Sequence, residues 1–308
     1  MAQVEQRPGS GDLARGPWRA VRDYVAITKP RIIELLLVTA IPSMILAARG
    51  WPEPVTAVAV IVGGMLAAGG ANAYNSVYDR DIDAVMARTH SRPVATGAVS
   101  PRGGLILATL LSVASVAILA VFANALAAAL AIVAIAFYAV GYTMLLKRRT
   151  SQNIVWGGAA GCMPVLIAWA AVTGTLSWTP VILFLIVFWW TPPHYWPLSL
   201  RYREDYAAAG VPMLPVVTDT RSVTRSIVVY SWIMVLTSLA LIPVAPMGAV
   251  YTVAAVVLGA VFLVEAHLLR RRALSGTADV RPMRLFHWSI TYLALLFLAV
   301  AIDPFIVS

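Results

Sequence analysis

Hydrophobic residues in this chain come in long uninterrupted blocks that are separated by short polar and charged segments. About twenty apolar residues cross a bilayer as a helix, and lipid restricts the spanning backbone to helices or closed barrels. The ten-residue alternating segments of a barrel strand do not occur between these blocks. The pattern therefore predicts an all-α, polytopic membrane protein.

Nine blocks are long enough to span a membrane. They cover residues 32–48, 55–78, 103–122, 123–146, 153–173, 180–200, 227–244, 248–269 and 287–305. The third and fourth blocks are nearly continuous around Asn124, so the connection between them is very short. We expect residues 1–28 to form a polar cytoplasmic tail and residues 29–308 to form the nine-helix domain.

The distribution of charge predicts how the chain is oriented. Only 12% of the residues are charged, 60% are hydrophobic, and the net charge is +9. Lys and Arg favour the cytoplasmic side of a membrane. With the N-terminus inside, every Lys and Arg except Arg49 falls in the tail or in a cytoplasmic loop. Topology and contact with anionic lipid thus account for the positive charge, and nucleic acid is not needed to explain it.

The most informative stretch is residues 72–97, with the sequence NAYNSVYDRDIDAVMARTHSRPVATG. Asn75, Asp79 and Asp83 are spaced four apart, and Asn72 lies three before Asn75. Residues three and four apart share one face of a helix, so we expect these side chains to lie together. Asp81 is about 200° around the helix from Asp79 and is left out of the group.

Two features favour a functional role over a solvated helix end. The aspartates follow the C-terminal end of a span, where the helix dipole opposes negative charge. Asn72 and Asn75 lie inside the apolar block, where polar groups are costly. Carboxylate and amide oxygens suit Mg²⁺, which commonly binds through one or two carboxylates and substrate phosphates. Asn75, Asp79 and Asp83 are therefore the candidate catalytic and metal-binding residues.

Basic residues close to these acids indicate a diphosphate site at the membrane surface, since guanidinium groups bind phosphate oxygens well. Lys147 and Arg148 have two interpretations, a positive-inside anchor or a diphosphate contact, and Lys29 and Arg31 have the same two with less weight. The candidate diphosphate ligands are Asn72, Arg88, Arg92, Lys147, Arg148 and Asn153.

A second acidic patch follows the sixth block at Glu204 and Asp205. The two longest inner loops, residues 79–102 and 201–226, both open with acids and are four blocks apart. This arrangement is typical of two halves of similar build. Glu204 or Asp205 is the candidate ligand for a second Mg²⁺.

The segment TPPHYW near the inner end of the sixth block contains His194. A single histidine is usually a packing residue, but it can also ligate the iron of a porphyrin. Interfacial aromatic residues are common in membrane proteins, so the tyrosines and tryptophans nearby have the same two interpretations. The candidate acceptor-binding residues are His194, Tyr195, Trp196 and Tyr202.

The segment of residues 72–97 resembles the first signature of the intramembrane prenyltransferases related to 4-hydroxybenzoate polyprenyltransferase. Further segments are similar to the branch of this family that acts on heme. They are ITKPRI at 27–32, KRRTSQNIVWGGAAGCMPVLIAW at 147–169 and WWTPPHYWPLSLRYREDYAAAGVPMLPVV at 189–217. The resemblance covers most of the chain.

This resemblance implies nine helices around a central cavity in the cell membrane, with the active site on the cytoplasmic side. It implies Mg²⁺-dependent transfer of the farnesyl group of farnesyl diphosphate to a vinyl group of protoheme IX, with addition of water, to give heme O and diphosphate. A heme A synthase is the implied partner for the product. Many relatives carry a fuller Asp-x-x-x-Asp in the second motif, so the ligand roles of Glu204 and Asp205 are weaker than those of Asp79 and Asp83.

Two alternatives stay open from the residues alone. The first signature also fits prenylation of a quinone precursor or another aromatic acceptor. A transporter would instead place ionisable residues near the midplane of the bilayer along a path. The acids of this chain cluster at the cytoplasmic end of the spans, which favours an enzyme.

Overall fold

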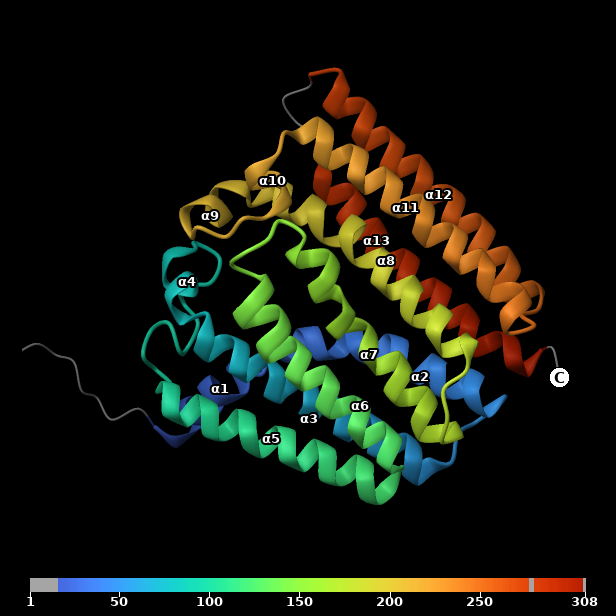
Figure 1. The fold of residues 1–308 in the computed structure, drawn as a ribbon, viewed down its shortest axis with the longest axis horizontal. Helices are drawn as coiled ribbons and strands as arrows, with labels where there is room; N and C mark the ends of the chain where they lie inside the picture. The colour runs from blue at the N-terminus through green and yellow to red at the C-terminus, as the bar shows by residue number, and fades with distance from the viewer. Residues whose placement is uncertain (1–15, 277–279, 307–308) are drawn as a thin grey trace, which may run out of the picture.

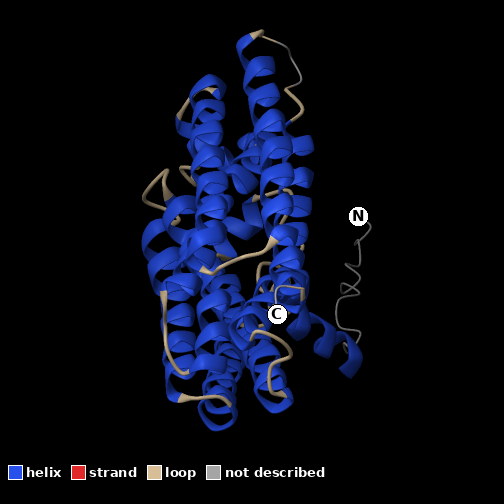
Figure 2. Cartoon of the chain, turned by 90° about the vertical axis from the view of Figure 1, so that its right-hand side faces the viewer, coloured by secondary structure: helices blue, strands red, loops and turns tan. Residues whose placement is uncertain are grey.

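The computed structural model describes residues 16–276 and 280–306, with only the backbone described for residues 31–36. Within these residues the chain is all-helical and has no strand, as predicted (Figure 2). The long helices are α2 (Pro30–Ala48), α3 (Pro54–Tyr78), α5 (Pro101–Phe122), α6 (Ala125–Ala136) continuing as the π-helix η1 (Phe137–Leu146), α7 (Asn153–Thr173), α8 (Trp178–Arg201), α11 (Thr220–Val244), α12 (Ala249–Leu274) and α13 (Pro282–Ile302).

These helices correspond in order to the nine predicted spans. Eight of them, with α6 and η1 taken together, are long and apolar enough to cross a membrane. The ninth is α2, whose fully described residues include the apolar segment Leu37–Ala48. The main difference lies in α11, which begins at Thr220 rather than at residue 227 because the Asp219 side chain accepts a hydrogen bond from the Ser222 amide. A capped polar turn therefore extends this helix beyond its apolar block.

The short connection between the third and fourth spans consists of Ala123 and Asn124. The Asn124 side chain caps α6 by accepting a hydrogen bond from the Ala127 amide at 2.9 Å. Its Nδ2 also donates to the carbonyl oxygen of Ala170 in α7 at 2.7 Å. The Asn124 side chain thus caps the start of α6 and attaches the turn to α7.

The long helices form two groups that meet along α2 and α7 (Figure 1). In the first group, α3, α5, α6, α7 and α2 contact one another in succession. In the second group, α8, α11, α12 and α13 pack around an apolar core that includes Ile186, Ile227, Phe262 and Leu296. The core of the second group is filled by these side chains, whereas the first group encloses open space.

That open space is a cavity between α2, α3, α6, η1 and α7, and it measures about 820 Å³ when the part open to the surroundings is included. Its lining is mostly alanine, glycine and aliphatic side chains, together with Asn72 of α3 and Tyr138 of η1. An apolar cavity with a few polar groups at one place is typical of a binding site for a largely hydrophobic ligand.

Two short helices lie side by side at one end of the molecule (Figure 1). Helix α4 (Arg80–Val85) follows α3 after the single residue Asp79, and α9 (Arg203–Ala208) follows α8 after the single residue Tyr202. Buried side chains of the two loops pack together in one cluster, which contains Ile82 and Tyr206. The predicted similarity of the two halves is therefore visible in their backbone. We call this the α4–α9 end.

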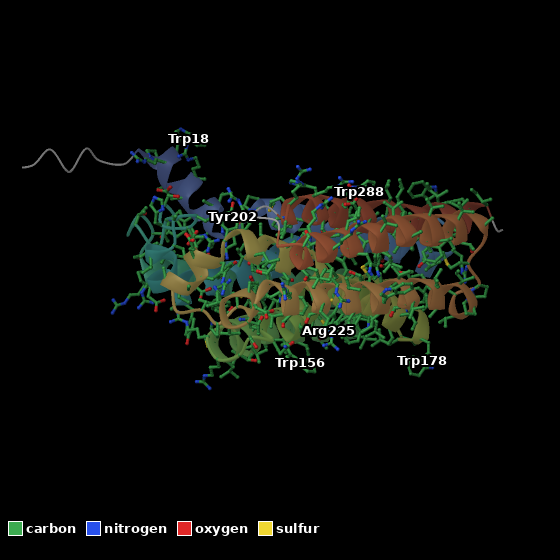
Figure 3. All side chains as sticks on the ribbon, turned by 90° about the horizontal axis from the view of Figure 1, so that it is seen from above. Trp18, Trp156, Trp178, Tyr202, Arg225 and Trp288 are labelled. Carbon is green, nitrogen blue, oxygen red and sulfur yellow. The ribbon has the colours of Figure 1, made fainter. Side chains whose placement is uncertain are left out.

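The predicted tail is described only in part, because residues 1–15 lie outside the described residues. Residues Pro17–Ile27 form α1, which packs on α3 and α5 through the buried Ile27. Trp18 of α1 and Trp178 of α8 both point outward and are 85% and 75% exposed (Figure 3). Outward tryptophans are typical of the two interfaces of a membrane.

Close packing of α3 on α5 gives the first testable prediction. A Cβ atom on Gly70 would lie 2.9 Å from the carbonyl oxygen of Ala108, so a side chain there must push the two helices apart. We expect Gly70→Ala to lower the free energy of unfolding in detergent by about 1–3 kcal/mol, the usual cost of overpacking.

The matched control is Gly64→Ala on the same helix, where a Cβ would meet nothing within 4 Å. Alanine favours a helix over glycine by about 1 kcal/mol, so this variant should be as stable as the parent or more stable. Equal stability of the two variants would contradict the packing argument.

Candidate active site

One face of α3 changes from apolar to polar as it approaches the α4–α9 end. Gly64, Ala68 and Ala71 line the cavity on this face. The same face ends with Asn72 and Asn75 and continues into the junction residue Asp79. Asn72, Asn75 and Asp79 are 4%, 3% and 0% exposed. The spacing predicted from the sequence therefore brings these three polar residues together at one end of the cavity.

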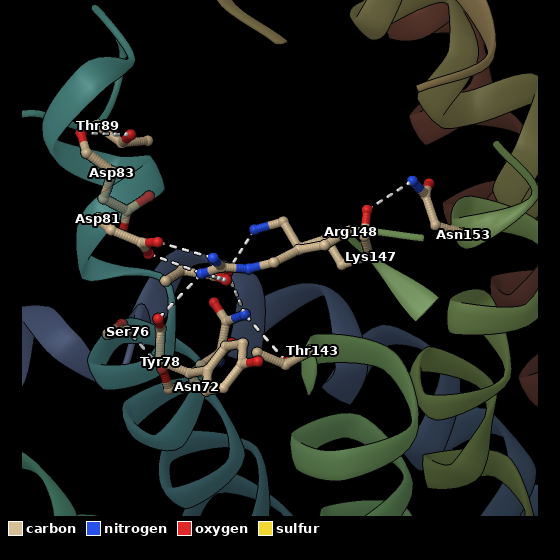
Figure 4. Close-up of polar contacts among 12 residues, drawn as sticks. Asn72, Ser76, Tyr78, Asp81, Asp83, Thr89, Thr143, Lys147, Arg148 and Asn153 are labelled. Atoms are coloured by element: carbon tan, nitrogen blue, oxygen red, sulfur yellow. Dashed lines mark hydrogen bonds and ion pairs between the residues drawn. The ribbon is translucent and has the colours of Figure 1, made fainter. Parts of the chain in front are cut away.

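The Asp79 carboxylate is the centre of this polar end. Its Oδ2 accepts hydrogen bonds from the Nδ2 of Asn75 at 2.7 Å and from the Nζ of Lys147. Its Oδ1 is buried and accepts no hydrogen bond from any described residue, although the Arg148 guanidinium lies 3.7 Å away. Figure 4 shows Arg148 reaching across to Asp81, with Thr143 nearby. A buried carboxylate oxygen without a hydrogen bond is costly unless a ligand or cation completes it.

Lys29 reaches the same group from the junction of α1 and α2. Its Nζ donates to the Oδ1 of Asn75 at 2.5 Å. Its backbone is left-handed, with a φ of 55°, an unfavourable conformation for a residue with a side chain. Burial, the largest cause, together with the neighbouring cations Arg92 and Lys147, lowers the pKa of this ammonium to about 7. Strained backbone of this kind is often found at functional sites.

The π-helix η1 brings its side chains to the site. The amide of Lys147 donates to the carbonyl oxygen of Tyr142, five residues back, at 2.8 Å. In an α-helix, at about 100° per residue, Tyr138 and Lys147 would lie on opposite faces. A turn that closes over five residues is wider, so both residues come to the wall that faces α3. Thr143, between them, accepts a hydrogen bond from the Nδ2 of Asn75 at 3.1 Å.

The other two aspartates have separate arginine partners. Asp83 is buried, and the Nη1 of Arg92 lies 2.8 Å from both of its oxygens. Asp81 is 62% exposed in its side chain and forms two hydrogen bonds of 2.7 Å with Arg148. These bonds hold the pKa of Asp81 at about 2. Asp81 is thus outside the buried group, as predicted, and Arg148 joins the α3–α4 junction to the loop after η1.

Asn72 and Asn153 complete the predicted diphosphate ligands on this side. The Oδ1 of Asn72 accepts a hydrogen bond from the hydroxyl of Tyr138 at 3.3 Å, at the boundary between the polar end and the cavity. Asn153 is buried and donates from Nδ2 to the carbonyl oxygen of Lys147 at 3.2 Å. Its Oδ1 has no hydrogen bond with any described residue.

The residues of the polar end fit a divalent hard cation. In the described part of the chain, three or more His, Cys, Asp or Glu side chains do not come together as a metal site. Asp79 offers a buried carboxylate oxygen, whereas the Asn75 amide oxygen and the Asp83 carboxylate accept hydrogen bonds from Lys29 and Arg92. Mg²⁺ often takes only one or two carboxylates and completes its shell with phosphate and water. The buried Oδ1 of Asp79 accepts no hydrogen bond from a described residue, so it is available to bind such an ion.

The second acidic patch is built differently. Glu204 is exposed and Asp205 is half-buried at the start of α9. Neither side chain forms a hydrogen bond or ion pair among the described residues, so their roles as metal ligands remain predictions. Tyr202 and Tyr206 occupy the places in α8–α9 that Asp79 and Asp83 occupy in α3–α4. The second half therefore presents phenols where the first presents carboxylates.

Arg88 belongs to these tyrosines rather than to Asp79. Its Nη2 donates to the hydroxyl of Tyr206 at 3.4 Å, and its guanidinium lies 5.8 Å from the centre of the Tyr202 ring. The hydroxyls of Tyr206 and Tyr195 are 2.7 Å apart. Arg88 thus links the loop after α4 to both α8 and α9.

His194 and Trp196 point away from Tyr195. The His194 ring is stacked between Trp190 and Phe286, at centroid distances of 4.1 and 4.7 Å. The hydroxyl of Ser289 donates to the carbonyl oxygen of Phe286, so the His194 Nδ1, 2.6 Å from that hydroxyl, must be the donor. In the neutral ring the proton is therefore on Nδ1, and Nε2 carries an electron pair.

Trp196 is 1% exposed and meets Tyr230 of α11 edge to face at 5.3 Å. It is a residue of the apolar core of the second group. The four candidate acceptor residues are therefore not brought together: Tyr195 and Tyr202 lie by Arg88, His194 faces α13, and Trp196 faces α11.

Several residues of the site have little or no signal in the sequence. The sequence favours Lys147 over Lys29, yet both make direct contacts in the Asn75–Asp79 group. Tyr138 and Thr143 lie inside an apolar block, and Tyr206 stands beside more conspicuous acids. Only the backbone register of η1 and α9 shows that Tyr138, Thr143 and Tyr206 belong to the site.

The fold and this site together define an intramembrane protein whose buried acids and bases stand above an apolar cavity. The chain belongs to the UbiA prenyltransferase family, whose model matches residues 36–290. This result confirms the resemblance found in the sequence and the class of enzyme, a prenyltransferase.

Similar curated proteins cover nearly the whole chain. A protoheme IX farnesyltransferase from Clavibacter sepedonicus is 58% identical over 289 residues, which are 94% of each chain. Another from a Nocardioides species is 58% identical over 310 residues and 99% of each chain. A third from Streptomyces coelicolor is 52% identical over 99% of this chain and 100% of that protein.

Solved structures share the fold at low identity. A digeranylgeranylglyceryl phosphate synthase has a TM-score of 0.76 at 16% identity, over 92% of this chain and 98% of its own. A UbiA homologue from Aeropyrum pernix has a TM-score of 0.71 at 19% identity, over 89% and 98%. A UbiA homologue from Archaeoglobus fulgidus bound to DMAPP and Mg²⁺ has a TM-score of 0.65 at 16% identity, over 91% and 99%.

The Asp83–Arg92 pair gives a prediction for stability. Arg92→Met leaves the Asp83 carboxylate, whose side chain is 3% exposed, without its cation. Because Arg92 itself is 28% exposed, we expect a loss near the lower end of the range for broken buried pairs, about 3 kcal/mol in the free energy of unfolding without divalent ions.

The control is Arg80→Met in the same short segment. Arg80 is exposed and donates only to the carbonyl oxygen of Val77, so its loss should cost less than about 1 kcal/mol. Denaturant unfolding in detergent compares the two. A loss at Arg92 no greater than that at Arg80 would show that Asp83 does not depend on this pair.

Proposed function

We propose that this chain transfers the farnesyl group of farnesyl diphosphate to a vinyl group of protoheme IX, with addition of water, to give heme O and diphosphate. The observation that carries the proposal is the buried Asp79 at the polar end of an apolar cavity, with one oxygen that accepts no hydrogen bond from a described residue. The names of relatives at 52–58% identity support the heme acceptor.

The cavity and its polar end match the two parts of a prenyl diphosphate. The alanines and glycines of the lining leave room for an isoprenoid chain, and Asn72 and Tyr138 mark where the lining becomes polar. An isoprenoid placed there brings its diphosphate beside Lys29, Lys147 and Asp79. Apolar burial would hold the chain, and charge would hold the head.

Asn75, Asp79 and Asp83 would hold Mg²⁺. When bound, the ion supplies neutralisation of the charge that develops on the departing diphosphate. Arg92, Lys147 and Arg148 now pair with these aspartates or their neighbour, so they are in place to take over phosphate oxygens. We keep Arg88 as a diphosphate candidate that also touches the tyrosines, and Glu204 or Asp205 as candidate ligands of a second ion.

The reaction requires that the C1–O bond of farnesyl diphosphate break with its electron pair on the diphosphate. The vinyl carbon of heme then supplies the electron pair of the new bond to C1. Positive charge moves to the carbon beside the porphyrin, where water adds as hydroxyl and releases a proton. The apolar lining next to Asn72, which includes Ala71 and Ala68, keeps water from the allylic cation before the vinyl group attacks. The cations of the polar end stabilise the leaving group.

For the acceptor, the Nε2 of His194 is the candidate ligand of the heme iron. Its free electron pair follows from the hydrogen bond of Nδ1 to Ser289. Trp190 and Phe286 fix the plane of the ring from both sides, which would orient that electron pair. Tyr195 and Tyr202 remain candidates for contacts to another part of the acceptor, whereas the packing of Trp196 favours a structural role.

The multi-pass helices place the protein in a lipid bilayer, and we propose that the α4–α9 end faces the cytoplasm. Arg80, Arg88, Arg92, Lys147 and Arg148 all lie at this end, which favours the cytoplasmic side. A charged donor made in the cytoplasm would then reach the polar end directly. A heme A synthase is the partner that would take over the product. Residues 1–28 and 29–308 remain our proposed division of the chain.

Replacement of Asp79 tests the metal assignment. We expect Asp79→Asn to lower the rate of heme O formation in detergent roughly 10²–10³-fold, since it removes a charge that would hold the ion at the leaving group. EDTA should abolish product formation by the parent enzyme, and Mg²⁺ should restore it. Product is measured by chromatography of the extracted heme.

Asp81→Asn is the matched control, because Asp81 is a neighbour of the same type whose side chain faces Arg148 at the surface. Loss of an exposed pair costs about 1 kcal/mol or less, so the rate should stay within roughly fivefold of the parent. Normal product formation by Asp79→Asn would remove Asp79 from the site.

Replacement of His194 tests the acceptor assignment separately. His194→Phe keeps an aromatic ring between Trp190 and Phe286 but removes the iron ligand. We expect heme affinity, measured from the absorbance spectrum during titration, to fall at least about tenfold, the equivalent of 1.4 kcal/mol. Binding of farnesyl diphosphate should not change.

His287→Phe is the control for this experiment, since His287 lies on the same stretch of α13 as Phe286 but is exposed. It should leave the heme spectrum and affinity as in the parent. If His194→Phe also leaves the heme spectrum and the heme affinity unchanged, His194 is a packing residue.

A further inference from the structure

Two of the helical glycines, Gly64 and Gly161, have no packing reason to be glycine, unlike their neighbours Gly63 and Gly157. A Cβ on Gly63 would lie 2.8 Å from the Cγ of Leu119, and one on Gly157 would lie 2.2 Å from the ring of Tyr142. At Gly64 and Gly161, by contrast, a Cβ would meet nothing within 4 Å. Both of these line the cavity. Because glycine costs a helix about 1 kcal/mol relative to alanine, its use where no neighbour requires it calls for another explanation.

The two glycines lie at different depths. Gly161 is one turn beyond Gly157, which packs on Tyr142, while Tyr138 is one turn beyond Tyr142 on the facing helix. Gly161 is therefore at the level of Tyr138, whose hydroxyl meets Asn72 at the entrance to the cavity. Gly64 precedes Asn72 by eight residues on α3, which places it about 12 Å deeper at 1.5 Å per residue.

The cavity continues past Gly64 by one more turn of α3. Val60 is the next residue on this face to line the cavity, with Ile167 of α7 and Leu37 of α2 also in the lining. Val60 is thus the branched aliphatic side chain that comes after Gly64 on α3. A side chain at position 64 would fill the space before Val60 and shorten the cavity, whereas one at position 161 would narrow its entrance.

We propose that Gly64 determines how long an isoprenoid chain the enzyme accepts, and that Gly161 keeps the entrance wide enough for any isoprenoid. The inference rests on the proposed function in one respect, that a prenyl diphosphate binds with its head at Asp79 and its tail in this cavity. The buried Asp79 oxygen without a hydrogen bond marks the head end independently of the glycines. The third isoprene unit of farnesyl would occupy the space that a side chain at position 64 would fill.

Binding of donor analogues without heme is the experiment. Farnesyl and geranyl thiodiphosphate, with Mg²⁺, are titrated into the purified parent and into Gly64→Val, Gly161→Val and Gly50→Val. Gly50 also has open space around it but does not line the cavity. One methylene too many in an apolar pocket changes discrimination roughly 10–200-fold.

We expect Gly64→Val to weaken farnesyl binding by at least about tenfold while geranyl binding stays close to that of the parent. Gly161→Val should weaken both, and Gly50→Val neither. An unchanged farnesyl-to-geranyl ratio in Gly64→Val would overturn the proposal. If valine prevents folding, Gly64→Ala replaces it, because alanine supports the helix and still adds a methyl group; its ratio should fall in the same direction, and an unchanged ratio would again overturn the proposal.

A parallel assay with heme separates this inference from the proposed function. If the parent binds both analogues with the expected glycine dependence but forms no prenylated heme, the acceptor is wrong and the role of Gly64 stands. If the parent farnesylates heme and Gly64→Val accepts farnesyl as well as before, the function stands and the role of Gly64 is wrong.

Discussion

The buried carboxylate of Asp79 is the constraint on which the site depends. A carboxylate that is 0% exposed at the end of a membrane helix loses its hydration, and that loss is tolerable only where cations and hydrogen bonds replace water. Lys147 and Asn75 provide them directly, and Lys29 is joined through Asn75. One charge thus draws together the start of α2, the end of α3 and the loop after η1.

The two halves of the molecule share a backbone plan but have different interiors. In the first, small residues on α3 and α7 leave a cavity that leads to the buried acids. In the second, large side chains such as Trp196 and Phe262 fill the corresponding group of helices. Phenols at Tyr202 and Tyr206 stand where the first half has Asp79 and Asp83. This division suits a reaction with one anionic, chain-like substrate and one aromatic substrate.

Most of the fold and about half of the site follow from the sequence. The spans were predictable because each is a local block of apolar residues, and the Asn75–Asp79 contact was predictable because residues four apart meet on any helix. The second patch was harder to predict from the sequence, because Glu204 and Asp205 are its conspicuous charges. In the structure, the one-residue break at Tyr202 aligns the tyrosines, and not these acids, with the aspartates of the first half. Likewise His194, Tyr195 and Trp196 are adjacent in sequence yet face three different neighbours.

The sequence by itself determined that the chain is a polytopic helical membrane protein with a cluster of acids and bases at one end, because apolar length and i, i+4 spacing act locally. Only the tertiary structure decided that Lys29 meets Asn75, that η1 is wound as a π-helix which turns Tyr138 and Lys147 to one wall, and that Gly64 borders open space while Gly63 does not. These features depend on which helices meet and in what register, and contacts between segments far apart in the chain leave no periodic trace in either segment.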